Sequence, residues 1–133
     1  MLYPMALMVL LTLIVGLVSA RARFSSLRSG DVEVKYFKLM QGQDIPERVT
    51  VTTRSFNNMF EVPVLFYVVC TLYISLGVEG FPGLVLAWLF VSLRYLHAYI
   101  HLTYNNLLHR MLCFWASFIC VLLLWVNLIL QEI

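Results

Sequence analysis

The chain has 133 residues, of which 62% are hydrophobic and only 12% are charged. A soluble domain is about half apolar and about a quarter charged, so this composition indicates a membrane protein without a second, soluble domain. The net charge is only +2, but seven of the nine basic residues lie between Arg21 and Arg54. This segment contains no nucleic-acid-binding motif, so we expect it to lie at a membrane surface, with no nucleic-acid partner.

The first predicted membrane span covers residues 2–20, which carry no charge. A bilayer requires about 20 apolar residues per helix, and this stretch is long enough. Val18, Ser19 and Ala20 resemble a signal-peptide cleavage site, but no basic residue precedes the long apolar stretch. We therefore expect a retained transmembrane helix.

Residues 21–52 form the only long polar segment, and the sequence predicts a loop interrupted by Gly30, Gly42 and Pro46. Within this loop, residues 31–37 alternate as in a short strand, but one isolated strand carries little weight. The threonines before the next apolar stretch are candidate N-caps for its helix, because a hydroxyl can accept from the first free backbone N–H groups. They are Thr50, Thr52 and Thr53.

Three more spans are predicted at residues 53–76, 82–105 and 110–130, with Pro82 suited to the first turn of its helix. The fold class is therefore an all-α membrane protein, a single four-transmembrane-helix bundle covering residues 1–133. The positive-inside rule places the 21–52 loop in the cytoplasm and both termini on the opposite side. The cysteines form no metal-binding or disulfide pattern and are interpreted as small apolar packing residues. They are Cys70, Cys113 and Cys120.

A first polar cluster opens the second span. Arg54, Asn58 and Glu61 are spaced i, i+4 and i+7, which places them on one helical face. Pro63 lacks a backbone donor and predicts a bend next to Glu61. A carboxylate within a span requires a cation or a ligand amine, so the cluster is a candidate binding site. The alternative is a purely structural stripe that pairs with the third span.

A second polar cluster occupies the third span, mostly in its cytoplasmic half. It is expected at the same depth in the membrane as the first cluster. Convergent polar groups at one depth indicate a shared pocket. Its members are Arg94, Tyr95, His97, Tyr99, His101 and Asn105.

The spacing of His97 and His101 permits a shared metal ion, but a catalytic metal usually takes three protein ligands and no third one is evident. No metal site is therefore predicted, and interhelical hydrogen bonding is favoured for both histidines. The roles of these histidines and of Arg94 stay open.

At these residues the chain resembles the MAPEG superfamily, the membrane-associated proteins in eicosanoid and glutathione metabolism. Arg54, Asn58, Glu61 and Pro63 reproduce the signature that opens the family's second helix. Residues 93–99, Leu-Arg-Tyr-Leu-His-Ala-Tyr, and residues 18–21, Val-Ser-Ala-Arg, are similar to its leukotriene-forming branch.

The resemblance implies four-helix protomers that assemble as homotrimers and bind glutathione, as co-substrate, between adjacent subunits in the cytoplasmic half. It also implies a lipophilic small-molecule substrate. The residues expected to hold glutathione are Arg21, Arg54, Asn58, Glu61, Tyr95 and Tyr99.

The chain also departs from the family pattern. Asn106 stands where the leukotriene-forming branch has an arginine implicated in activating the thiol. Arg110, one helical turn further on, or Arg23 in the loop segment is expected to take that role. These departures indicate a divergent, bacterial-type branch, and hence a bacterial inner membrane.

Three functional hypotheses follow from the sequence. The first is a glutathione transferase or peroxidase acting on lipophilic electrophiles or lipid hydroperoxides. The second is a non-catalytic structural or accessory subunit of a larger assembly of membrane subunits, which the loss of the arginine at position 106 favours. The third is a metal- or quinone-linked redox protein that uses His97 and His101.

Overall fold

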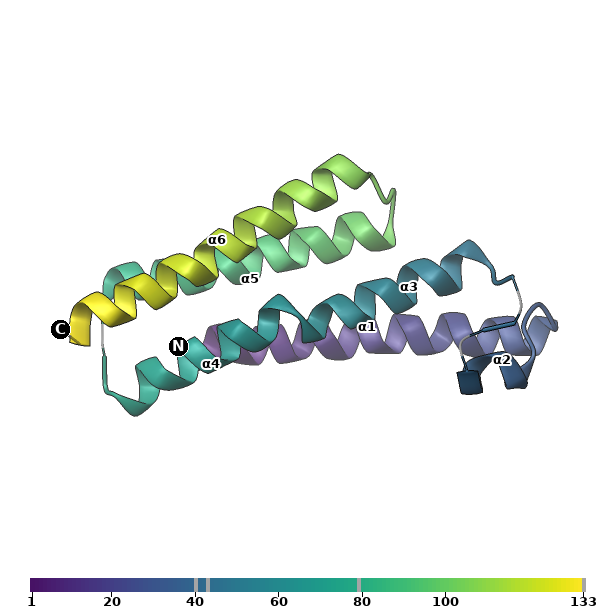
Figure 1. Ribbon diagram of the computed structural model, residues 1–133, viewed down its shortest axis with the longest axis horizontal. Coiled ribbons are helices and arrows are strands. Elements are labelled where there is room, and N and C mark those ends of the chain that lie inside the picture. Colours follow the sequence, from purple (N-terminus) through teal and green to yellow (C-terminus); the bar gives the residue numbers. More distant parts are fainter. Residues whose placement is uncertain (40, 43, 79, 133) are drawn as a thin grey trace.

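Four long helical rods make up the molecule in a computed structural model that describes every residue except 40, 43, 79 and 133 (Figure 1). The helices in chain order are α1 (Leu2–Ser29), α2 (Val34–Leu39), α3 (Glu47–Asn57), the 3₁₀ turn η1 (Asn58–Phe60), α4 (Val62–Ser75), α5 (Phe81–Leu102) and α6 (Leu107–Glu132).

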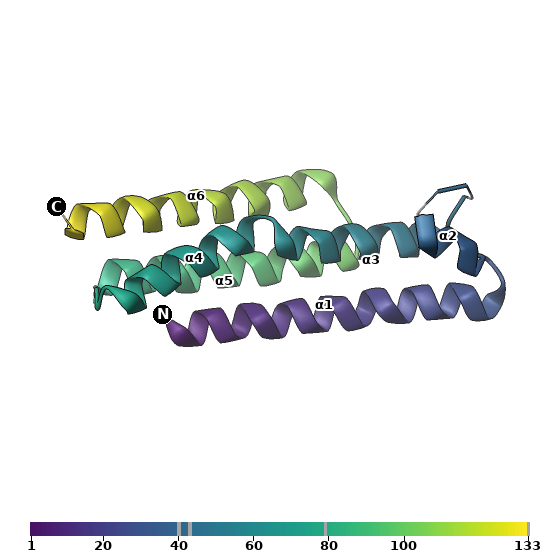
Figure 2. The ribbon, with the colours of Figure 1, turned by 60° about the horizontal axis from the view of Figure 1, so that its bottom comes forward.

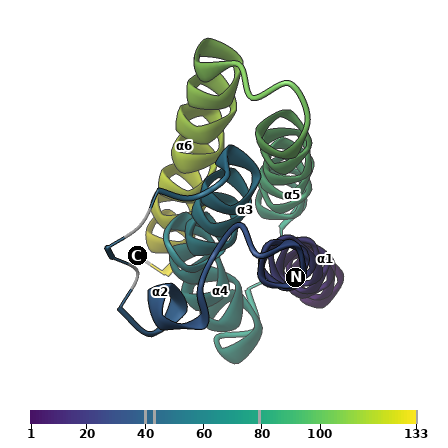
Figure 3. The ribbon, with the colours of Figure 1, turned by 90° about the vertical axis from the view of Figure 1, so that its right-hand side faces the viewer.

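Four segments are long and apolar enough to cross a membrane, namely α1, the continuous stretch Glu47–Ser75, α5 and Leu107–Gln131. No strand occurs among the described residues, so the all-α fold class is confirmed. Seen end-on, the four rods pack side by side, with the short α2 at one end of the bundle (Figure 3). Both termini lie at the other end (Figure 1), as an even number of spans requires.

The first helix is longer than predicted. It continues for nine residues past Ala20 and ends at Ser29, where Gly30 adopts a φ of 81° and donates its N–H to the carbonyl of Leu27. A left-handed residue of this kind ends a helix, and glycine adopts that conformation without steric cost. The basic residues that follow the apolar stretch therefore extend the helix into the polar region instead of starting a loop.

Two sequence patterns in and next to the polar segment have a different outcome in the structure. The strand-like alternation of residues 31–37 does not produce a strand, and from Val34 onward the chain forms α2, which buries Tyr36. The three threonines are not N-caps either. Pro46 precedes the first residue of α3, and the Thr52 hydroxyl donates to the carbonyl of Arg48 inside the helix.

Apolar side chains from all four spans form the hydrophobic core. The Phe66 and Phe90 rings stack with centroids 4.2 Å apart, linking α4 to α5. Tyr73, almost fully buried, donates its hydroxyl to Asn127 Oδ1 at 2.6 Å and so ties α4 to α6. All three cysteines are buried and free, which agrees with their predicted role as packing residues.

Candidate functional site

The second span is broken at the predicted binding signature, and Figure 2 shows the irregular turn between α3 and α4. The regular helix stops at Asn57, a 3₁₀ turn follows, and Glu61 adopts φ −97° and ψ −103° before α4 begins at Val62. Pro63 lies in the first turn of α4, where its missing N–H costs no helical hydrogen bond. The bend predicted from Pro63 is thus present. It also disrupts the regular helical spacing on which the predicted single stripe depended.

Asn58 sits at the break and is bonded on both its side chain and its backbone. Its side-chain amide donates to the carbonyl of Arg54 at 3.0 Å, and its own carbonyl accepts from Arg94 Nη2 at 2.8 Å. Arg54 and Glu61, on the two sides of Asn58, are both exposed on the protomer. The break therefore presents a cation and a carboxylate outward, with a half-buried amide between them.

Arg94 is the residue that holds the break in place. It is 0% exposed, and its guanidinium reaches from α5 to donate to the Asn58 carbonyl. In an uninterrupted helix that carbonyl would accept from the backbone N–H four residues later. The Nε and Nη1 atoms of Arg94 have no hydrogen-bond partner within the described part of the chain. The sequence showed Arg94 to be unusual but gave it no role.

The two tyrosines of α5 have different environments. Tyr95 is partly buried and donates its hydroxyl to the carbonyl of Leu7 at 2.9 Å, which fastens α5 to α1. Tyr99 is 62% exposed and presents its ring outside the protomer. Of the predicted ligands on α5, Tyr99 is therefore the one free to reach a molecule bound against the outer face.

His97 and His101 are packed inside the bundle, with 2% and 1% of their surfaces exposed and ring centroids 5.8 Å apart. His97 also packs against the Phe114 ring on α6. Among the described residues no third histidine, cysteine or carboxylate joins them in a metal-binding group. Among the described residues, His97 Nδ1 and both nitrogens of His101 have no partner for the hydrogen bonds that were predicted for these rings.

Arg110, one of the two arginines expected to activate the thiol, lies in the first turn of α6, next to the turn that joins α5 to α6. Arg110 Nη1 donates to Asn105 Oδ1 at 2.6 Å, and Asn105 adopts a positive φ of 48°, a conformation that asparagine tolerates well. Asn106 directly precedes α6, and its side-chain oxygen accepts the backbone N–H of His109 at 3.1 Å. This is an N-cap, so the residue that replaces the expected arginine stabilises the start of α6.

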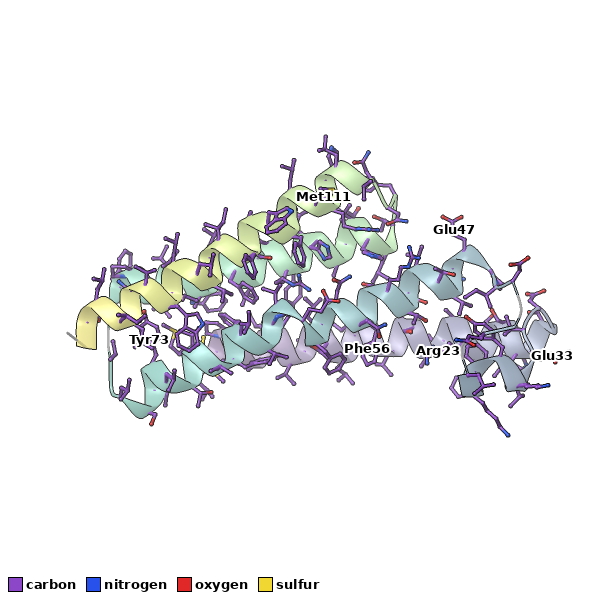
Figure 4. The ribbon with its side chains drawn as sticks, viewed as in Figure 1. Arg23, Glu33, Glu47, Phe56, Tyr73 and Met111 are labelled. Carbon is purple, nitrogen blue, oxygen red and sulfur yellow. The ribbon has the colours of Figure 1, made fainter. Side chains whose placement is uncertain are left out.

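The remaining predicted residues lie on α1. Arg21 is exposed, whereas Arg23 is partly buried and donates Nη2 to the Thr53 hydroxyl at 3.2 Å. The Arg23 guanidinium also lies 5.9 Å from the centroid of the Phe37 ring on α2. Arg23 therefore links three helices at one end of the bundle (Figure 4).

In a comparison with known protein families, the model of the MAPEG family matches residues 1–130. The chain belongs to the MAPEG family. Neither curated proteins nor solved structures give a match. As a MAPEG protein with four apolar spans, the chain is a multi-pass integral membrane protein related to glutathione and eicosanoid metabolism. The broken second span, held by Arg94, is the feature of this MAPEG chain that carries the signature residues.

Proposed function

We propose that this MAPEG protein binds glutathione against the face formed by Arg54, Asn58 and Glu61 and directs its thiol at lipophilic acceptors. In conjugation, the thiolate sulfur would form a bond to an electrophilic carbon while the leaving group departs with the bonding electrons. In peroxidase chemistry, two glutathione molecules would be oxidised to the disulfide while a lipid hydroperoxide is reduced to an alcohol and water.

The observation that carries this proposal is the outward pair of opposite charges at the break. Glutathione has two carboxylates and one amine, so a carboxylate would pair with Arg54 and the amine with Glu61 through charge-assisted hydrogen bonds. Both residues are exposed on a segment that spans the membrane, and charges facing lipid are costly. A neighbouring copy would remove that cost, which supports the homotrimer with glutathione between protomers.

The other residues predicted to bind glutathione fit this arrangement to different degrees. Tyr99 and Arg21 are exposed and free to close the site from α5 and from a neighbouring α1. Tyr95 already donates its hydroxyl to Leu7, so it would contribute only as an acceptor or through its ring. Both arginines already make a hydrogen bond, Arg110 to Asn105 and Arg23 to Thr53, but Arg23 also packs against Phe37, so for the thiolate we favour Arg110.

Calorimetry on the detergent-purified protein tests the proposal. Arg54→Ala and Glu61→Gln should each weaken glutathione binding about tenfold or more, since each removes a charged partner. Arg48→Ala is the matched control, because Arg48 is an exposed arginine on the same helix outside the signature. Equal affinity in wild type, Arg54→Ala and Arg48→Ala would refute the assignment.

A second function is a non-catalytic subunit of a larger membrane assembly, and the Asn106 cap favours it. That side chain is committed to the His109 N–H, so position 106 provides structure where an activating cation was expected. Purification under mild detergent distinguishes the two functions. Stoichiometric co-purification of other membrane subunits, together with no glutathione binding, would support this second function.

A further inference from the structure

Asn105 connects the end of α5 to the start of α6. It adopts a left-handed φ of 48°, and its backbone N–H donates to the carbonyl of Ile100 at 2.8 Å, which closes the end of α5. Its side-chain oxygen accepts from Arg110 Nη1 at 2.6 Å. Because the backbone of Asn105 is anchored to α5, this bond fixes one nitrogen of the Arg110 guanidinium relative to that helix.

Arg110 has donors left for a ligand. Its Nε and Nη2 atoms make no hydrogen bond within the described part of the chain, and neither is buried. Arg94 differs in this respect, because its unpartnered nitrogens are buried. A guanidinium presents its N–H donors in a fixed plane, so a bond to Nη1 also restricts the direction of the others. Arg110 is therefore held through one nitrogen and accessible through the other two.

Packing against α3 does not hold this turn. Thr103 and Asn105 line a cavity of about 440 Å³, and its lining also includes Arg48 and Thr52 of α3. In Figure 1 the α5–α6 turn and the start of α3 lie apart at the same end of the bundle. A long side chain keeps its rotamer freedom unless a local interaction removes it. The direction of the Arg110 guanidinium thus depends on the Asn105 bond more than on contacts with α3.

We propose that Asn105 is a positioning residue for Arg110 in the activation of glutathione. This inference rests on the proposed function, in which Arg110 stabilises the bound thiolate. Asn105 holds Nη1 so that the free nitrogens are directed at the thiol, whose proton passes to water as the thiolate forms. A cation beside a thiol favours the thiolate, and the attraction falls with distance. A guanidinium released from Asn105 spends less time near the sulfur and favours the thiolate less.

The left-handed backbone of Asn105 permits two informative variants. Glycine adopts a positive φ without steric cost, so Asn105→Gly removes the side-chain oxygen and leaves the turn in place. Asn105→Asp keeps an acceptor at the same position, since aspartate also tolerates this conformation. Its negative charge would hold Arg110 but oppose thiolate formation nearby. The control is Tyr104→Phe, which removes the hydrogen bond to His109 in the same turn without touching Arg110.

Phenylglyoxal labelling measures how firmly Arg110 is held, without glutathione. The reagent modifies accessible arginines, and peptide mass spectrometry of the detergent-purified protein gives the rate at each site. Labelling of Arg110 should be about threefold to tenfold faster in Asn105→Gly than in wild type. Asn105→Asp should label no faster than wild type, and Tyr104→Phe should label at the wild-type rate. Exposed Arg48 provides the internal reference, with the same rate in every variant.

Ultraviolet absorbance of bound glutathione, followed as a function of pH, measures thiol ionisation. In Asn105→Gly the acid dissociation constant of the bound thiol should fall about threefold to tenfold, a rise of its pKa by about 0.5 to 1 unit. Asn105→Asp should show a similar fall, although its Arg110 is protected from phenylglyoxal. Tyr104→Phe should titrate as wild type does.

Each result decides between the alternatives. The same thiol titration in wild type and Asn105→Gly would overturn the positioning role and leave glutathione binding intact. Fast labelling in Asn105→Asp would also overturn it, because the acceptor at position 105 would then not hold Arg110. An equal loss of ionisation in Tyr104→Phe would assign the effect to any loosening of the turn and so refute the role of Asn105. No glutathione binding to wild type would instead remove the proposed function, and this role with it, whatever the labelling rates.

Discussion

Replacing Arg94 with methionine separates a structural role from a role in positioning the binding signature. The variant loses the hydrogen bond to the Asn58 carbonyl, a charge-assisted interaction worth about 1.5–3 kcal/mol. It also removes two buried nitrogens that lack a partner in the described chain, each of which costs about 1–3 kcal/mol. These two effects oppose each other, although the variant also leaves the Asn58 carbonyl without its partner. We therefore expect the free energy of unfolding to change by less than about 2 kcal/mol.

Glutathione affinity should respond differently from stability. Without Arg94 the turn from Asn58 to Glu61 is no longer held against α5, so the outward geometry of Arg54 and Glu61 is no longer fixed. We expect at least a tenfold loss of affinity, about 1.4 kcal/mol. Thermal unfolding in detergent and calorimetric titration measure the two quantities on one sample. A strongly destabilised variant that binds glutathione normally once folded would refute the positioning role.

Three further predictions address other parts of the bundle. Tyr73→Phe should lower stability by about 0.5–1.5 kcal/mol in thermal unfolding, because the hydroxyl's hydrogen bonds to Asn127 and to the Leu124 carbonyl are lost, while glutathione affinity stays unchanged. Asn106→Ala should cost about 1 kcal/mol in the same measurement through loss of the N-cap to His109, and Asn106→Asp should recover most of it. Arg110→Met should reduce the thiolate fraction of bound glutathione, measured by ultraviolet absorbance at neutral pH, with little change in affinity; an unchanged thiolate signal would exclude Arg110.

The spans were predictable because each one is long, apolar and almost free of charge. An interruption of the second span near Glu61 was also predictable, because Pro63 has no backbone N–H to donate to the preceding turn. The ends of α1 and α3 were not, because a polar helix outside the hydrocarbon layer has no apolar signal. Arg21 and Arg28 belong to such an extension, and the sequence alone placed them in a loop.

The candidate site was predicted as a set of residues but not as an arrangement. The pattern located Arg54, Asn58 and Glu61, yet it could not show that a carbonyl at the break would accept from Arg94. That bond depends on α5 packing against η1, which is a tertiary contact. The cap formed by Asn106 is a local interaction, and an asparagine directly before an apolar helix could have revealed it.

The most direct test of the proposed function compares glutathione with its deamino analogue on wild type and Glu61→Gln. Calorimetry on the detergent-purified protein should show saturable glutathione binding to wild type and at least tenfold weaker binding of the analogue. In Glu61→Gln the two ligands should bind with nearly equal, weak affinity, because the partner of the amine is gone. No binding of glutathione to wild type at millimolar concentration would contradict the account, as would an undiminished preference for glutathione in Glu61→Gln.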